Sequence, residues 1–213
     1  MSSGGSVPAV GQLGRTTEFE GIKLHSPMTA KTKNRIFLTG VSCVGKTTIG
    51  AVLAHLLGYR FYDLDCEVEA FYGLSIERLQ NRHNSMHDFR SAAAKVLEHI
   101  LSSPESHRCV VALSPRGLMG PYWKVVKRTE ATIVAIHDDS ESILKRINFF
   151  DIDSRPIEKT LTETERQMYL REIKADIRYF RVSYRKATMT VNISGLNIEG
   201  SAQKIKAEVE ALP

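Results

Sequence analysis

A phosphate-binding loop is the clearest chemical signal in the sequence, in FLTGVSCVGKTT at residues 37–48. Gly40 and, after four intervening residues, Gly45, Lys46 and Thr47 match the pattern GxxxxGK[ST]. The glycines let backbone N–H groups turn inward around phosphates, and Lys46 and Thr47 would contact the β- and γ-phosphates and Mg²⁺. The predicted nucleotide-binding residues are Gly40, Val41, Ser42, Cys43, Val44, Gly45, Lys46, Thr47 and Thr48.

Two aspartates end the next predicted strand, in FYDLD at residues 61–65. Because side chains alternate along a strand, Asp63 and Asp65 are predicted to point to one face beside the phosphate loop. One carboxylate would hold metal-bound water, and the other would accept a proton from an attacking hydroxyl. The alternative is an acidic strand-to-helix turn that caps the following helix.

The composition argues against several other classes of protein. Of 213 residues, 42% are apolar and 25% are charged, and no apolar run approaches the roughly 20 residues of a membrane span. The net charge of +5 is spread along the chain, so no nucleic-acid partner is indicated. Cys43, Cys66 and Cys109 lack metal-binding spacing, which favours free thiols in a reducing, cytoplasmic environment. We expect a soluble monomer without a membrane partner.

The order of the predicted elements indicates one domain that follows an N-terminal extension. Residues 1–34 are rich in Gly, Ser, Thr and Pro without sustained periodicity, which predicts a flexible extension. From residue 35 to residue 213, strands and helices alternate, which predicts a three-layer α/β fold with a five-stranded parallel sheet flanked by helices. Predicted strands cover 35–39, 59–65, 109–113, 131–136 and 187–193, and predicted helices cover 47–58, 66–73, 89–101, 140–147, 163–185 and 197–212.

The chain resembles the shikimate kinase family from residue 35 to about residue 210. The resemblance rests on GVSCVGKTTIGAVLAHLLGYRFYDLDCEVEAFYGLSIERL, on DFR at 88–90 and on RPI at 155–157. It implies a P-loop kinase fold with a substrate-binding helical region and a lid at about 148–165. It also implies that ATP, with Mg²⁺ as cofactor, phosphorylates a hydroxyl of shikimate in aromatic amino acid biosynthesis.

The resemblance assigns roles to the residues around the acceptor. Asp63 would lie near Mg²⁺, and Asp65 would bind the substrate hydroxyls and act as the base. Arg90 would hold the substrate carboxylate, for which a planar guanidinium fork is better suited than a lysine.

The resemblance further implies three roles for arginines in the second half of the chain. Arg155 on the lid would clamp the transferring phosphate, and Arg146 would stack on the nucleotide base. A second carboxylate-binding arginine corresponds to Arg178, with Arg181 as a competitor one helical turn further along.

The chain departs from the family pattern at several places, among them two positions that bear directly on acceptor binding. Where the family has three glycines after the third strand, this chain has Ser114, Pro115 and Arg116. Proline lacks an N–H to donate, and neither proline nor arginine approaches a ligand as closely as glycine. Ala93 occupies the position of a family glutamate three residues after the carboxylate-binding Arg90.

Three hypotheses are open from the sequence alone. The first is phosphorylation of shikimate to shikimate 3-phosphate by a divergent acceptor pocket. The second is a related kinase for another hydroxylated, anionic small molecule, in which Arg116 adds a positive contact. The third is a nucleotide-binding protein that has lost transfer activity. The joint retention of six residues argues against the third hypothesis: Lys46, Thr47, Asp63, Asp65, Arg90 and Arg155.

Overall fold

A five-stranded parallel sheet with the strand order β2-β3-β1-β4-β7 forms the centre of the protein. The computed structural model describes residues 34–213, so residues 1–33 of the predicted extension over residues 1–34 lie outside the described part. Every pairing within the sheet is parallel, which confirms the predicted architecture. Its strands are β1 (Arg35–Thr39), β2 (Arg60–Asp63), β3 (Cys109–Ala112), β4 (Thr132–His137) and β7 (Met189–Asn192).

Continuous runs of apolar residues explain the three central strands. β1, β3 and β4 consist mainly of buried residues, as expected for a parallel sheet that is covered on both faces. Phe37 of β1 pairs with Val111 of β3 on one side and with Ile133 of β4 on the other. The edge strands β2 and β7 are more exposed because each has a neighbour on one side only.

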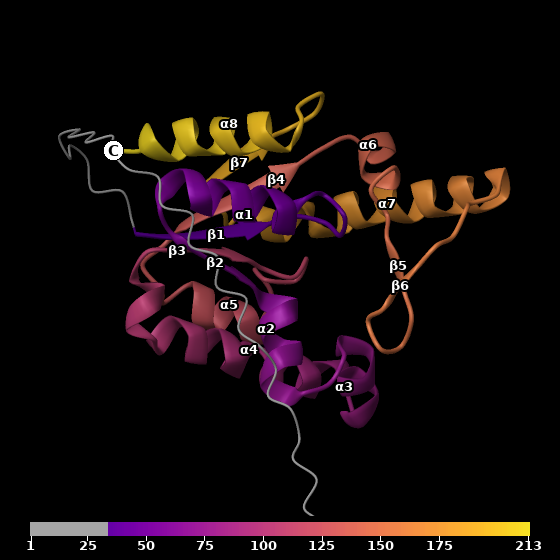
Figure 1. Ribbon diagram of the computed structural model, residues 1–213, viewed down its shortest axis with the longest axis horizontal. Coiled ribbons are helices and arrows are strands. Elements are labelled where there is room, and N and C mark those ends of the chain that lie inside the picture. The colour runs from indigo at the N-terminus through magenta and orange to yellow at the C-terminus, as the bar shows by residue number, and fades with distance from the viewer. Residues whose placement is uncertain (1–33) are drawn as a thin grey trace, which may run out of the picture.

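Helices cover both faces of this sheet (Figure 1). α1 (Lys46–Leu57) and α8 (Ile198–Glu210) pack together on one face, whereas α4 (Met86–Ser102) and α5 (Gly120–Val126) pack together on the other. Their buried side chains form two apolar cores, which completes the three predicted layers. Within residues 34–213, every helix is too short or too polar to cross a membrane.

The helices of the second layer differ in detail from the prediction. α4 begins at Met86 instead of residue 89, because the Ser85 hydroxyl caps it by accepting a hydrogen bond of 3.1 Å from the Asp88 amide. The remaining helical elements are α2 (Leu64–Tyr72), α3 (Ile76–Arg82), the 3₁₀ helix η1 (Pro104–His107), α6 (Ser140–Leu144) and α7 (Glu163–Tyr184). The short helices α3 and α5 were not predicted, since seven residues are too few for a clear helical period.

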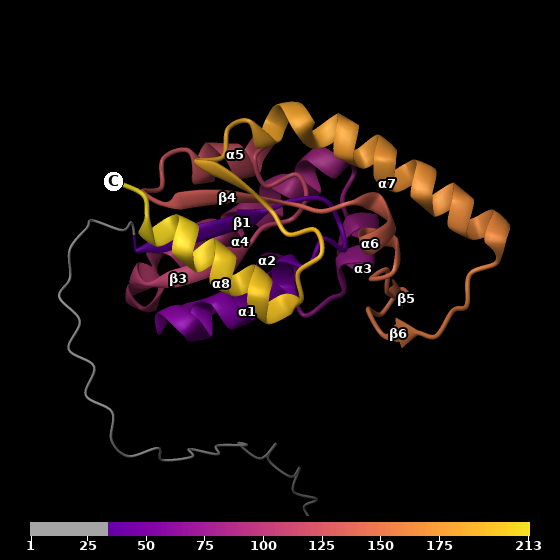
Figure 2. The ribbon, with the colours of Figure 1, turned by 90° about the horizontal axis from the view of Figure 1, so that it is seen from above.

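The predicted lid contains a small antiparallel hairpin of β5 (Phe149–Phe150) and β6 (Pro156–Ile157). It lies beyond α6, away from the five-stranded sheet and next to the start of α7 (Figures 1 and 2). A capping box of Thr162 and Glu165 starts α7 at Glu163, just before the predicted end of the lid.

The core between α1 and the sheet can be tested with one substitution. Leu53 on α1 has no exposed surface, so Leu53→Ala should lower the free energy of unfolding by about 2–5 kcal/mol through lost packing. Leu196→Ala is the matched control, because Leu196 is 44% exposed. Urea-induced unfolding measures both variants, and equal losses would contradict the assignment of Leu53 to the core.

Candidate active site

The phosphate loop joins β1 to α1, as the sequence predicts, and its shape depends on two glycines. Gly40 has φ of 152°, and a Cβ atom there would lie 2.7 Å from the Ile136 carbonyl oxygen of β4. Gly45, directly before α1, has φ of 104°. Both positions would strain any residue with a side chain, and Gly40 also has no room for one. The loop therefore lies tightly against the end of β4.

Cys43 takes a left-handed backbone conformation in the middle of the loop, with φ of 58°. Alternation of right- and left-handed residues turns successive N–H groups toward a common centre, which produces an anion-binding concavity. α1 follows directly and adds the partial positive charge of its N-terminus. The backbone of this loop is suited to hold phosphates.

Lys46 places its ammonium group across the loop. Its Nζ donates to the carbonyl oxygens of Gly40 at 3.0 Å and Val41 at 2.9 Å. Burial lowers the pKa of Lys46 to about 8, and the negative charge of Asp65 is the largest of the influences that oppose this shift. A phosphate group would replace the carbonyl oxygens as the partner of this ammonium.

Asp63 is the last residue of β2 and joins the phosphate loop to α2. Its Oδ2 accepts a hydrogen bond of 2.6 Å from the Thr47 hydroxyl. Its Oδ1 caps α2 by accepting from the amides of Asp65 at 3.0 Å and Cys66 at 3.3 Å. The Asp63 carboxylate can therefore cap α2 with one oxygen and serve the proposed metal site with the other.

Asp65 does not lie on a strand, and this corrects the alternation argument for the two aspartates. β2 ends at Asp63, and Asp65 is in the first turn of α2, because the Asp63 side chain starts the helix there. Asp65 is exposed by accessible surface, although the protein around its carboxyl group desolvates it enough to shift its pKa. Burial, together with the Asp63 carboxylate, raises the pKa of Asp65 to about 6, and Lys46 opposes this shift.

Arg90 lies in α4 and is half-buried, whereas Ala93 one turn later is almost fully buried in the core. A glutamate at position 93 would have to point its charge into this apolar core. Ala93 is thus part of the packing between α4 and its neighbours.

Tyr122 on α5 is a site residue that the sequence did not reveal. Burial raises the pKa of its hydroxyl to about 12; the Asp65 carboxylate adds to this effect, and the Ser114 hydroxyl and Arg90 oppose it. The phenol is therefore within electrostatic reach of Asp65 and Arg90. The buried Ser114 Oγ lies close enough to the Tyr122 hydroxyl to affect its pKa, but it forms no well-aligned hydrogen bond within residues 34–213. No motif could have identified Tyr122, because the short helix that carries it was itself not predicted.

The segment of Ser114, Pro115 and Arg116 is held by α7. The Arg116 guanidinium donates to the Tyr179 hydroxyl at 3.0 Å, and its centre lies 5.1 Å from the Tyr179 ring centroid. The Tyr184 hydroxyl donates to the Pro115 carbonyl oxygen at 3.1 Å. Arg116 therefore has partners on α7 in this structure, and its predicted contact with an acceptor stays a prediction.

The two candidates for a second carboxylate-binding arginine, Arg178 and Arg181, are both exposed on α7. Within residues 34–213, neither side chain forms an ion pair of 4.0 Å or less. The choice between them stays open.

Arg146 supports the phosphate loop from the turn that follows α6. Its guanidinium donates to the Val44 carbonyl oxygen at 3.0 Å and pairs with Asp138, whose side chain is 2% exposed. These contacts bring Arg146 to the loop, and stacking on a base stays a prediction. Arg155 lies between the hairpin strands, and its side chain is exposed.

The oxygen atoms of Thr47 and Asp63 could serve as ligands for Mg²⁺. Within residues 34–213 there is no cluster of three or more His, Cys, Asp or Glu side chains that could hold a metal ion. Mg²⁺ commonly uses one or two protein ligands and completes its shell with phosphate oxygens and water. The pair of Thr47 and Asp63 fits that mode of binding.

Comparisons with known proteins agree with this geometry. The family model for shikimate kinase matches residues 42–210. Shikimate kinase of Chlorobaculum tepidum is 32% identical over 181 residues, covering 82% of this chain and 91% of that protein. Shikimate kinase of Geobacter metallireducens is 27% identical over 175 residues, with the same coverage of 82% and 91%.

A solved structure of shikimate kinase from Acinetobacter baumannii in complex with shikimate is also similar. It has a TM-score of 0.65 and 26% identity, and the match covers 83% of this chain and 93% of that chain. The phosphate loop and the helix α2 that Asp63 caps are consistent with the fold and family of these relatives. The chain belongs to the shikimate kinase family of ATP-dependent small-molecule kinases.

Proposed function

We propose that this kinase transfers the γ-phosphoryl group of ATP to a hydroxyl of shikimate and forms shikimate 3-phosphate. The proposal rests mainly on the position of Asp65. Its negative charge acts to raise the pKa values of Lys46 in the phosphate loop and of Tyr122. The Arg90 guanidinium influences the pKa of Tyr122 in the opposite direction. A carboxylate beside the phosphate loop, with an arginine that acts on the same tyrosine, suits an acceptor that is both hydroxylated and anionic.

The phosphate loop would bind the donor. Lys46 would exchange its two carbonyl partners for phosphate oxygens, and Thr47 and Asp63 would hold Mg²⁺. When bound, Mg²⁺ would neutralise charge on the β- and γ-phosphates. Arg146 would contact the nucleotide base, next to its bond with the loop.

Asp65 would orient the acceptor hydroxyl and take its proton. A carboxyl group with a pKa near 6 is largely ionised at neutral pH, and it is more basic than an ordinary aspartate. Arg90 would bind the acceptor carboxylate, with Arg178 or Arg181 as a second contact. Arg155 would stabilise the transferring phosphoryl group from the lid.

A second candidate acceptor is another hydroxylated, anionic small molecule. The observation that favours it is the Ser114–Arg116 segment, in which the buried Ser114 Oγ lies near the Tyr122 hydroxyl but forms no well-aligned hydrogen bond in the described chain. A ligand that gives this hydroxyl a well-aligned hydrogen bond would gain affinity. The side chains of this segment would select such a ligand through contacts that the three glycines of the family pattern cannot make.

An acceptor panel tests the proposal directly. Purified protein with ATP and Mg²⁺ would be assayed for ADP release with shikimate, sugar acids and cyclic polyols. We expect release that depends on shikimate. Release with another acceptor alone would support the second candidate, and no release with any acceptor would support a nucleotide-binding protein without transfer activity.

The role of Asp65 predicts a selective loss of turnover. Asp65→Asn should lower kcat by about 10²-fold or more, because it removes the proton acceptor, while the KM for ATP changes little. Glu67→Gln is the control, since it removes a carboxylate from the same helix, α2. Unchanged kcat in the Asp65 variant would eliminate the base assignment.

Arg90 and Arg116 are expected to behave differently when truncated. Arg90→Ala should raise the KM for the acceptor by roughly 10- to 100-fold, because it removes a charged hydrogen bond of about 1.5–3 kcal/mol. Arg116→Ala should mainly lower the melting temperature, because its guanidinium packs on α7. A selective rise in acceptor KM for the Arg116 variant would instead indicate that this arginine binds the acceptor.

A further inference from the structure

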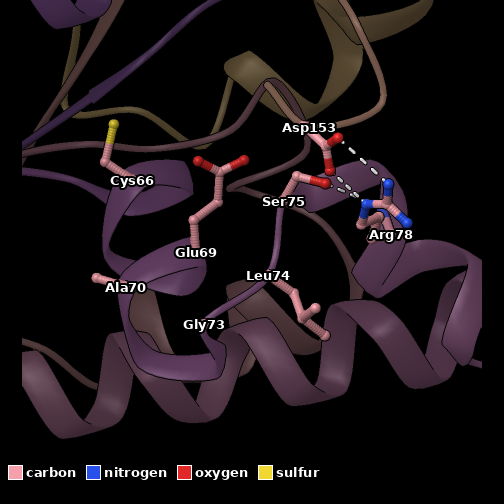
Figure 3. A pocket seen from close by; sticks show the side chains of 8 residues that line it. All are labelled: Cys66, Glu69, Ala70, Gly73, Leu74, Ser75, Arg78 and Asp153. Carbon is pink, nitrogen blue, oxygen red and sulfur yellow. Dashed lines mark hydrogen bonds and ion pairs between the residues drawn. The ribbon is translucent and has the colours of Figure 1, made fainter. Parts of the chain in front are cut away.

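The tip of the lid hairpin is docked on α2, α3 and the turn between them (Figure 3). The Ser75 hydroxyl, which also caps α3, donates to the Ile152 carbonyl oxygen at 2.5 Å. Arg78 on α3 forms an ion pair with Asp153 and donates to its Oδ2 from Nη2 at 3.2 Å. Two side chains from one helical segment thus hold consecutive residues of the lid tip.

Glu69 on α2 provides a third contact. Its Oε1 accepts a hydrogen bond of 2.5 Å from the Ser154 hydroxyl of the lid. The same oxygen accepts a hydrogen bond of 2.8 Å from the Ile76 amide, at the start of α3. One carboxylate therefore binds the lid and also fixes the turn between α2 and α3.

The docked residues are rigidly joined to Arg155. The Asp151 Oδ1 accepts from the amides of Asp153 at 2.8 Å and Arg155 at 2.9 Å, and the Asp151 amide donates to the Arg155 carbonyl oxygen at 2.9 Å. Arg155 is also the immediate neighbour of Ser154. Any contact that fixes the lid tip consequently fixes the backbone of Arg155.

The docking surface lies close to Asp65. Glu69 follows Asp65 by four residues on α2, so the two side chains lie on the same face, about 6 Å apart along the helix axis. The Glu69 carboxylate is near enough to influence the pKa of Asp65. The lid tip is thus held about one helical turn from the acid that we assign as the base.

We infer that Glu69, Ser75 and Arg78 are positioning residues, which dock the lid and set Arg155 relative to Asp65 at the transferring phosphate. The assignment of Arg155 to that phosphate rests on the proposed function. The docking itself rests only on the contacts between the lid tip and α2–α3.

The contacts are suited to a lid that must also open. A cavity of about 740 Å³ borders Glu69, Ser75, Arg78 and Asp153, so the tip rests on a few polar contacts and not on a packed interface. The Arg78 and Asp153 side chains are 47% and 37% exposed. Ion pairs this exposed are weak and easily broken, which allows substrate to enter and product to leave.

Arg78→Ala tests the inference, with Arg82→Ala as the matched control. Arg82 is exposed on the same helix and forms no ion pair within residues 34–213. Hydrogen exchange of residues 149–157 should be ~2- to 5-fold faster in the Arg78 variant, as expected for losing an exposed ion pair. kcat should fall by a similar factor while the KM for ATP is unchanged, and the Arg82 variant should match the wild type.

A charge reversal separates docking from a general loss of structure. Arg78→Asp should release the lid, and adding Asp153→Arg should restore slow exchange and kcat. Unchanged exchange in the Arg78 variants would overturn the docking, and faster exchange with wild-type kcat would overturn the positioning of Arg155. If the wild-type protein transfers phosphate to no acceptor, the proposed function fails, while the exchange data still decide the docking.

Discussion

The carboxylate of Asp63 is the interaction on which the rest of the site depends. One oxygen contacts Thr47 of the phosphate loop, and the other caps α2. Because the cap fixes where α2 begins, it also fixes which residues of that helix face the phosphate loop. Asp65 comes in the first turn, and Glu69 follows one turn later under the lid. The single short helix α2 thus positions the residues that we assign to the donor, the acceptor and the lid.

The two halves of the site are built differently. The donor half is mostly backbone, since tight turns and a helix N-terminus form the phosphate loop. The proposed acceptor half consists of side chains from several elements, including Arg90 on α4 and, near the Ser114 hydroxyl, Tyr122 on α5. A site of this second kind can change its ligand through a few substitutions. The membership of the chain in the shikimate kinase family therefore constrains the donor more strongly than the acceptor.

The sequence predicted those features that depend on local backbone requirements. The phosphate loop could be located because Gly40 and Gly45 meet conformations that other residues avoid, and the sheet could be predicted from its continuous apolar strands. The position of Asp65 was mistaken because strand periodicity cannot show that the Asp63 side chain ends the strand. Tyr122 and the lid contacts depend on short elements brought together by tertiary packing, for which local periodicity gives no signal.

The most direct test of this account compares Asp63→Ser with Asp63→Ala, in urea-induced unfolding and in ADP release with shikimate. Serine can cap α2 but does not supply a carboxylate for Thr47 and Mg²⁺. The account predicts that Asp63→Ser unfolds close to the wild type but loses turnover, whereas Asp63→Ala loses turnover and also about 0.5–2 kcal/mol of stability. Wild-type turnover in the serine variant would contradict the claim that this carboxylate joins donor binding to the acceptor helix.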